Sequence, residues 1–277
     1  MNPVAKLVRA FRTLSLRLTT PIRIEFNLTD YCNLNCKGCT HYAPLAGEEY
    51  TPIAELELNM RHLSSIRRSR EIRQIYLIGG ETLLYPQINN AISLARHYFP
   101  WAEISIFTNA LLLPRMDDEF WELCRKNDTI IAITRYPVKF DYDCAVSICE
   151  RNHVRHSLFG DRSVSGSFFR VRLDPEKRQN RWIANFRCYS FGCLTVSDNK
   201  LFPCPQSACV RHLNKRFGTD FSIEKGDYIP ISDITDIRQI RRLRNHPIPF
   251  CGYCKKSLPT PYELSKRVKN EWIDTNK

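Results

Sequence analysis

Three cysteines stand close together in the stretch CNLNCKGC, where three residues separate Cys32 from Cys36 and two separate Cys36 from Cys39. Thiolates are soft ligands, so this spacing suits either a zinc ion or a cubane iron–sulfur cluster. A structural zinc site normally has a fourth protein ligand, and His41 is available for that role. A cubane held by three thiolates would instead leave one iron open to an external ligand. The stretch therefore predicts a metal site.

The cysteines follow a predicted strand at the start of a strand–helix alternation. Residues 22–28 place apolar side chains at alternate positions, and further strands are predicted over residues 74–78, 103–108, 129–134 and 153–159. Helices are predicted between them, beginning near residues 51, 87, 117 and 141. Such alternation is typical of a parallel sheet with helices outside. Since a full eight-unit barrel needs about 250 residues, we expect an α/β fold with an open, partial (βα)6 TIM-like barrel over residues 21–162.

Polar residues follow the ends of four of these strands. They are the cysteine loop, Gly79 to Glu81, Thr108 with Asn109, and Thr134 with Arg135. Because the carboxyl ends of parallel strands meet at one rim, where such folds place their active sites, we expect these residues to lie together. Arg135 and Tyr136 are candidate catalytic residues at this rim. A guanidinium there would bind a substrate phosphate or carboxylate, and a salt bridge to a neighbouring loop is the equal alternative.

Together these motifs resemble those of the radical S-adenosylmethionine (SAM) enzymes over residues 22–157. CNLNCKGC matches their cysteine loop after the first strand, GGET matches their Gly-Gly-Glu after the second, and FTN matches their Thr-Asn after the third. The resemblance implies that Cys32, Cys36 and Cys39 hold a 4Fe–4S cluster whose fourth iron is chelated by SAM. One electron then cleaves SAM to a 5′-deoxyadenosyl radical, which removes a hydrogen atom from the substrate, while the protein orients the cofactor and excludes water.

The resemblance also implies which residues contact SAM. Gly79 and Gly80 have no Cβ and would let the backbone approach the amino group of SAM, whose charge the Glu81 carboxylate would offset. Gly38 stands where the family usually has an aromatic residue, and Thr82 stands where it often has proline. The expected cofactor-binding residues are Gly79, Gly80, Glu81, Asn109 and Thr134.

A second group of cysteines lies in the last third of the chain. The stretch CYSFGCLTVSDNKLFPC, followed by CGYC, resembles the twitch domain, a half-size relative of the SPASM domain that holds an auxiliary 4Fe–4S cluster. Asn199, which tolerates a positive φ, stands at the hairpin glycine of that pattern. A zinc ribbon is the alternative. The resemblance implies the auxiliary ligands Cys188, Cys204, Cys251 and Cys254, with Cys193 as the alternate to Cys188 and Cys209 as a spare thiol or hydrogen donor.

The other segments complete a four-part organisation. Residues 1–20 are expected to form an amphipathic helix that packs against the barrel or, as the alternative, lies on an anionic membrane surface. Residues 163–187 are basic and polar and are expected to be a connecting segment, either a loop or a boundary region. Residues 188–277 are expected to form the twitch/SPASM-like domain, with a short β-hairpin, a helix near residues 234–243 and a polar tail.

Composition narrows the class of protein. The chain has 277 residues, 43% of them hydrophobic, and no apolar run approaches the ~20 residues of a membrane-spanning helix. Without a signal-peptide pattern we expect a cytoplasmic protein, in which twelve cysteines indicate metal binding or catalysis rather than disulfides. The net charge of +12 is spread along the chain without a nucleic-acid-binding motif. A solvated basic surface is the simplest interpretation, and a small anionic substrate is favoured over nucleic acid.

The expected function is that of a radical SAM enzyme, oxidoreductase-like, that removes a hydrogen atom from a small substrate and oxidises it. Small enzymes of this layout include aminocyclitol dehydrogenases and the first enzyme of molybdenum-cofactor synthesis. A sugar, cyclitol or nucleotide-linked substrate is therefore expected, in polysaccharide or natural-product biosynthesis, with flavodoxin or ferredoxin as the external reductant. The alternatives are a radical SAM peptide maturase or epimerase, and a non-enzymatic zinc or iron–sulfur protein that contacts nucleic acid.

Overall fold

The computed structural model describes residues 20–159 and 167–275. The helix expected over residues 1–20 lies outside these ranges apart from its last residue, and so does its expected membrane contact. Within the described part of the chain, no helix is both long enough and apolar enough to span a bilayer.

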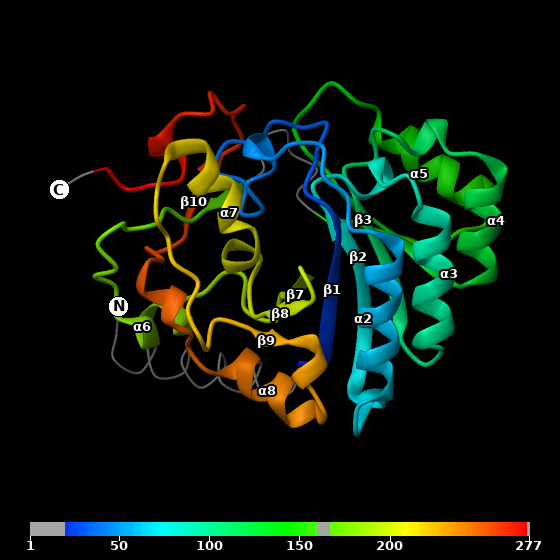
Figure 1. Ribbon diagram of the computed structural model, residues 1–277. Helices are drawn as coiled ribbons and strands as arrows, with labels where there is room; N and C mark the ends of the chain where they lie inside the picture. The colour runs from blue at the N-terminus through cyan, green and yellow to red at the C-terminus, as the bar shows by residue number, and fades with distance from the viewer. Residues whose placement is uncertain (1–19, 160–166, 276–277) are drawn as a thin grey trace, which may run out of the picture.

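One eight-stranded sheet organises the molecule, with the strand order β5-β4-β3-β2-β1-β7-β8-β9 (Figure 1). The pairs from β5 through β1 to β7 are parallel, whereas the β7–β8 and β8–β9 pairs are antiparallel. This mostly parallel α/β architecture confirms the expected fold class. The strands are β1 (Ile22–Thr29), β2 (Ile72–Gly79), β3 (Glu103–Thr108), β4 (Thr129–Thr134), β5 (His156–Phe159), β7 (Leu194–Ser197), β8 (Lys200–Phe202) and β9 (Ile229–Pro230).

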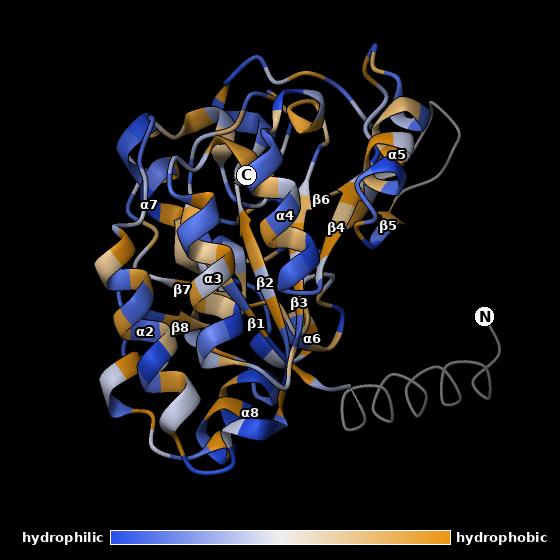
Figure 2. Ribbon diagram, turned by 90° about the vertical axis from the view of Figure 1, so that its right-hand side faces the viewer, coloured by the Kyte–Doolittle hydropathy of each residue, from blue (hydrophilic) through white to orange (hydrophobic). Residues whose placement is uncertain are grey.

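Amphipathic helices cover the sheet beside β1 to β5. In α3, the buried residues Ile88, Ala91, Ile92 and Ala95 recur at helical spacing and form one apolar stripe. Figure 2 shows both hydrophilic and hydrophobic residues on α2, α3 and α4, as expected of helices with one face on a sheet. These helices are α2 (Ile53–Ser65), α3 (Ile88–Tyr98), α4 (Asp118–Lys126) and α5 (Tyr142–Arg151), and the 3-10 turns are η1 (Ala43–Leu45), η2 (Ser69–Glu71), η3 (Thr82–Leu84), η4 (Leu113–Arg115), η5 (Ile231–Asp233), η6 (Pro249–Gly252) and η7 (Lys269–Glu271).

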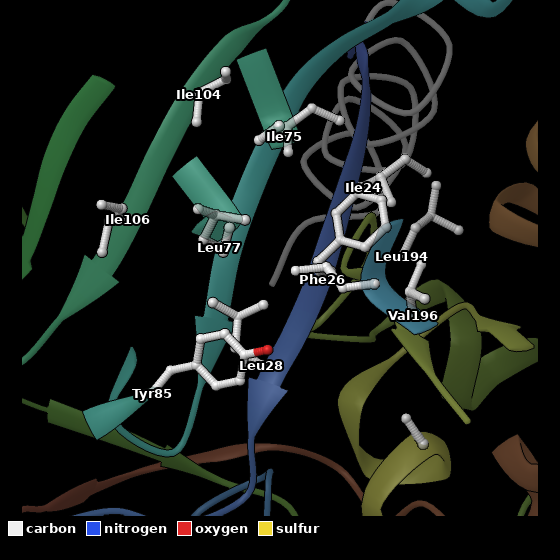
Figure 3. Packing of buried hydrophobic residues seen from close by; sticks show 14 of the residues in the cluster. Ile24, Phe26, Leu28, Ile75, Leu77, Tyr85, Ile104, Ile106, Leu194 and Val196 are labelled. Atoms are coloured by element: carbon white, nitrogen blue, oxygen red, sulfur yellow. The ribbon is translucent and has the colours of Figure 1, made fainter. Parts of the chain in front are cut away.

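The core lies along β1 and its neighbours (Figure 3). Ile24, Phe26 and Leu28 of β1 are fully buried, as are Ile75 and Leu77 of β2. Burying each such side chain contributes roughly 1.5–3 kcal/mol. The strand ends that carry the polar residues are therefore positioned by a well-packed core.

The hairpin of β7 and β8 extends this sheet. β7 pairs in parallel with β1, with Ile24 opposite Leu194 and Phe26 opposite Val196. The hairpin turn has positive φ at Asp198 (51°) and at Asn199 (56°), which confirms the conformation expected of Asn199. The hairpin that was assigned to a separate C-terminal domain thus shares its sheet with the barrel strands.

The expectation of a loop over residues 163–187 is wrong for its described part. This segment contains β6 (Ser167–Arg170), which pairs in an antiparallel manner with β10 (Leu258–Pro261), and the short helix α6 (Arg181–Phe186). Asn180 caps α6 by accepting hydrogen bonds from the backbone N–H groups of Trp182 and Ile183. The basic, polar composition gave no sign of β6, because its partner β10 lies far along the chain.

Two helices complete the C-terminal part. α8 (Ile237–Asn245) contains most of the predicted apolar stripe and begins with a capping box formed by Asp236 and Gln239. α7 (Pro205–Phe217) was not predicted, and it begins directly after Cys204. In Figure 1, α7 and α8 lie on the side of β1 opposite to α2 and α3.

Asp30, directly after β1, joins the sheet to α7. Its carboxylate forms an ion pair with Arg211, lies 2.9 Å from Nε2 of His212, and accepts a 2.7 Å hydrogen bond from Asn27. Burial by itself would raise the pKa of Asp30, but the hydrogen bond from His212 and the charge of Arg211 hold it below its usual value. This contact holds the start of the cysteine loop against the helix that follows Cys204.

We expect Asp30→Asn to lower the free energy of unfolding by about 2 kcal/mol, measured by urea denaturation. The loss of the anion removes the buried partner of Arg211 and His212, and the cost is moderated because Arg211 is partly exposed and keeps its contact with Asp198. Asp198 lies 2.9 Å from the same Arg211 but is 60% exposed. Asp198→Asn is therefore the matched control and should cost less than about 0.5 kcal/mol. Equal losses in the two variants would contradict the role given to Asp30.

Candidate active site

A pocket of about 120 Å³ opens at the carboxyl ends of β1 to β4. Except for Arg135, the residues expected to meet at this rim do so, with contributions from the cysteine loop and from the ends of β2, β3 and β4. Its lining includes Cys32, Cys36, Cys39, His41, Gly79, Gly80, Glu81, Thr108, Asn109, Thr134 and Tyr136. The pocket thus contains all three cysteines of the first group and all five residues expected to contact a cofactor.

The three thiols of this pocket lie in a low-polarity environment. Burial raises the pKa of Cys36 to about 12 and also raises those of Cys32 and Cys39 above the usual thiol value. The backbone N–H of Leu34 donates a 3.3 Å hydrogen bond to Sγ of Cys32. Thiols in such surroundings become thiolates when a metal centre compensates their charge, so the donor set fits a soft metal site.

A C-terminal segment braces the cysteine loop. The Ser265 N–H donates to the Asn35 carbonyl at 2.7 Å, and Nε1 of Trp272 donates to the Cys39 carbonyl at 3.0 Å. The Tyr262 hydroxyl oxygen lies 3.7 Å from Sγ of Cys36. The sequence predicted only a polar tail here, because nothing in its composition indicates a partner more than 200 residues away.

Gly79 and Gly80 are required by the approach of β1 to β2. A Cβ on Gly79 would lie 2.3 Å from the Thr29 carbonyl oxygen, and a Cβ on Gly80 would lie 2.2 Å from that of Tyr31. The Gly80 N–H donates to the Thr29 carbonyl at 2.8 Å, and the Glu81 N–H donates to that of Tyr31 at 2.8 Å. The expected reason for these glycines was access for a cofactor, whereas the observed contact is between two backbones.

Glu81 connects the ends of β2 and β3. Its buried carboxylate accepts hydrogen bonds from Oγ1 of Thr108 at 2.6 Å, from the Asn109 N–H at 2.8 Å and from the Leu83 N–H at 3.0 Å. Burial raises the pKa of Glu81 above its usual value, although the hydrogen bonds from Asn109 and Thr108 act in the opposite sense. This carboxylate is therefore a structural link as well as part of the pocket wall.

The three candidate catalytic residues lie in different places. Tyr136 lines the pocket, and burial raises its pKa well above 10, so its phenol is a neutral donor. Arg135 is not part of the described lining, and its backbone N–H donates to the Phe159 carbonyl at 3.0 Å. Cys209 is fully buried on α7, with Sγ 4.0 Å from Oδ1 of Asp30, and also lies outside the lining.

Gly38 adopts a left-handed conformation, with φ of 71°. A Cβ there would lie 2.5 Å from Cγ of Arg170, whose side chain covers this part of the cysteine loop. The position at which the family usually has an aromatic residue is therefore occupied by an arginine from β6.

The second group of cysteines gathers at a separate place. Cys188 and Cys254 line a cavity of about 210 Å³ between α6 and the start of α7. Burial, together with the nearby thiols of Cys204, Cys251 and Cys188, raises the pKa of Cys254 well above its usual value. Burial likewise raises the pKa values of Cys204 and Cys251 to about 11. All four expected auxiliary ligands thus lie close to one another.

Cys193, the alternate to Cys188, has different neighbours. Nη2 of Arg23 donates a 3.3 Å hydrogen bond to its sulfur, and the buried Glu25 also contacts it. Glu25 in turn accepts a 3.3 Å hydrogen bond from Thr195. These contacts on β1 direct Cys193 toward the sheet and separate its surroundings from those of Cys188.

Comparison with known proteins finds a family model that matches part of the chain. Residues 26–134, which include the cysteine loop and the ends of β1 to β4, match the model of the Radical SAM superfamily. This match spans less than half of the chain, and it agrees with the resemblance to the radical SAM enzymes that the motifs carry. The resemblance implies a 4Fe–4S cluster and SAM as cofactors, and the residues around the pocket fit both.

Curated relatives match part of the chain. GTP 3′,8-cyclase of Heliobacterium modesticaldum is 29% identical over 96 residues, which are 35% of this chain and 29% of the cyclase. Molybdenum cofactor biosynthesis protein 1 of Bos taurus is 28% identical over 122 residues, which are 43% of this chain and 19% of that protein. The matched part thus spans less than a third of each relative.

A solved structure resembles nearly the whole fold. The crystal structure of BtrN in complex with AdoMet and 2-DOIA has a TM-score of 0.52 and 17% identity, and the match covers 86% of this chain and 94% of BtrN. At this identity the likeness concerns the fold alone.

We expect Gly80→Ala to lower the free energy of unfolding by about 1–3 kcal/mol or more, because the added methyl group meets backbone that cannot move aside. Denaturant unfolding under anaerobic conditions measures the change. The matched control is Gly47→Ala, since a Cβ on Gly47 meets its nearest atom, Oε1 of Glu49, at 3.9 Å. The control should change stability by less than about 0.5 kcal/mol. A Gly80→Ala protein as stable as the control would disprove the stated reason for this glycine.

Proposed function

We propose that this chain holds a 4Fe–4S cluster through Cys32, Cys36 and Cys39, and that SAM binds in the same pocket. The observation that carries the proposal is one pocket lined by all three thiols, the Gly-Gly-Glu turn, Asn109 and Thr134. Three thiols in a short loop supply soft ligands and leave a fourth position to a small molecule. A structural zinc site is closed by protein ligands, whereas these thiols line an open pocket of about 120 Å³, which argues against the non-enzymatic alternative.

When bound, the cluster and SAM would supply a 5′-deoxyadenosyl radical that removes a hydrogen atom from the substrate. The chain's own residues bind and orient these groups. Glu81, held by three donors, would offset the charge of the SAM amino group, and Asn109 and Thr134 would contact the ribose or the sulfonium. Tyr136 and Tyr262, with ring centroids 5.8 Å apart, would form a wall that excludes water.

We further propose that Cys188, Cys204, Cys251 and Cys254 hold a second 4Fe–4S cluster. Their mutual proximity and the separate contacts of Cys193 support this ligand set. A cluster with four protein thiolates has no open iron for a substrate, so its role would be electron transfer. Removing a hydrogen atom, a proton and a second electron from an alcohol gives a ketone. An electron-accepting site of this kind favours net oxidation over epimerisation.

The proposed substrate is a small sugar, cyclitol or nucleotide-linked molecule, consistent with a role in polysaccharide or natural-product biosynthesis. The partial similarity to GTP 3′,8-cyclase and the net charge of +12 support an anionic, nucleotide-linked member of this class. All twelve cysteines are free, which is consistent with the proposed cytoplasmic location. Flavodoxin or ferredoxin would supply the first electron.

The first test uses the variant with Cys32, Cys36 and Cys39 all replaced by Ala. Anaerobically prepared wild-type protein should hold about eight irons and eight sulfides, and the triple variant should hold about four. With dithionite and SAM, wild type should release 5′-deoxyadenosine slowly even without substrate, and the triple variant should release none. Iron analysis and chromatography of the nucleoside measure the two quantities.

Cys124→Ala is the matched control, because Cys124 is a fully buried cysteine on α4, outside both groups. It should keep about eight irons and the cleavage of SAM. Zinc in place of iron under strict anaerobiosis, or equal cleavage by wild type and the triple variant, would overturn the proposed function.

A second test distinguishes oxidation from epimerisation. Cys254→Ala should still cleave SAM but should form little oxidised product, because the substrate radical then lacks its electron acceptor. Assays in deuterated water with candidate sugars, cyclitols and nucleotide sugars, followed by mass spectrometry, would reveal the outcome. One solvent deuterium fixed at a carbon of an unoxidised product would favour the epimerase alternative instead.

A further inference from the structure

Tyr42 lies between the two groups of cysteines. It follows Cys39 by three residues in the chain, and its side chain is 0% exposed. Its hydroxyl has no hydrogen-bond partner among the described residues. Leaving a buried hydroxyl without a partner costs roughly 1–3 kcal/mol. This orphan donor therefore points to an acceptor that residues 20–159 and 167–275 do not supply.

The surroundings of the Tyr42 ring indicate what that acceptor is. Burial raises the pKa of Tyr42 well above 10, and the charges of nearby thiolates at Cys254, Cys204, Cys209 and Cys39 add to this effect in that order. Two of these thiols, including the one with the largest effect, belong to the second group. The phenol is thus a buried, neutral donor that has thiols of both groups among its neighbours.

The backbone of Tyr42 is held firmly on the side of the first group. Its N–H donates to the Cys39 carbonyl at 3.1 Å, and its own carbonyl accepts from the Leu45 N–H at 2.8 Å. η1, which begins at the next residue, packs against α7, as Figure 1 also shows. Because α7 begins directly after Cys204, this contact places Tyr42 next to the start of the second group of cysteines.

We propose that the Tyr42 hydroxyl donates a hydrogen bond to a sulfur atom of the second cluster and thereby raises the reduction potential of that cluster. The proposal rests on the proposed function, because it requires a cluster at Cys188, Cys204, Cys251 and Cys254. A hydrogen bond to cluster sulfur stabilises the reduced state, which carries more negative charge. Tyr42 is thus a positioning residue: it belongs to the SAM loop and acts on the electron acceptor.

The test compares Tyr42→Phe with Tyr85→Phe in the full-length protein. Tyr85 is also a buried tyrosine, but its hydroxyl donates to the Thr51 carbonyl at 2.7 Å. Redox titration followed by electron paramagnetic resonance measures both clusters, and the signal that changes on addition of SAM identifies the first one. We expect Tyr42→Phe to shift the SAM-insensitive midpoint to a more negative potential and to leave the other unchanged. Tyr85→Phe should shift neither.

Site-specific incorporation of 3-fluorotyrosine at residue 42 provides a second variant, which keeps the ring and the hydroxyl. Because its phenol is more acidic and a stronger donor, the SAM-insensitive midpoint should move in the opposite direction, to a more positive potential. Unchanged midpoints in both variants at about eight irons would overturn the role of Tyr42 alone. A wild-type protein with about four irons would instead overturn the second cluster, and the role of Tyr42 with it.

Discussion

The contact between the backbones at the ends of β1 and β2 is the constraint on which the rest of the pocket depends. The cysteine loop leaves the sheet from the end of β1, and the Glu81 carboxylate leaves it from the end of β2. Two adjacent glycines allow these ends to touch, with the Gly80 N–H bonded to the Thr29 carbonyl. The thiols and the carboxylate therefore share one cavity. Glu81 then transmits this geometry to β3 through its bonds to Thr108 and Asn109.

A shared sheet relates the two groups of cysteines. β7 pairs with β1, and Asp30 forms an ion pair with Arg211 on α7. The second group is therefore held by backbone hydrogen bonds and a partly exposed ion pair. A flexible linker would instead allow a range of distances between the two groups. A defined separation would matter for the proposed electron transfer, and Tyr42 has thiols of both groups among its neighbours.

Much of the barrel could be predicted because its signals are local. β3 and β4 have the predicted bounds, and the glycine turn and the cysteine loop follow predicted strand ends, as the topology of parallel sheets requires. The β6–β10 pair could not be found in this way, since its register depends on residues from distant parts of the chain. α7 did carry local signals, with Pro205 at its first turn and Gly218 at φ of 59° after its end.

The details of the site depended on contacts that a sequence does not display. The role of Glu81 follows from the register of β3, which brings the Asn109 N–H to its carboxylate. The choice between Cys188 and Cys193 depends on Arg23 and Glu25, which lie on a strand about 170 residues earlier in the chain. The spacing of the sequence did not distinguish Cys188 from Cys193 as a candidate ligand. In the folded chain the two differ, because only Cys193 is described in contact with Arg23 and Glu25.

The bonds between the C-terminal segment and the cysteine loop have a consequence for the order of biosynthesis. Trp272 contacts the carbonyl of Cys39 across 233 positions of the chain. On the ribosome, the loop emerges long before the segment that covers it, so the three thiols remain uncovered while most of the polypeptide is being made. Delivery of iron and sulfide can therefore precede closure, and the arrival of residues 262–272 would then seal the loaded loop. The contacts of residues 262–272 with the cysteine loop would then retain a cofactor that was inserted during translation.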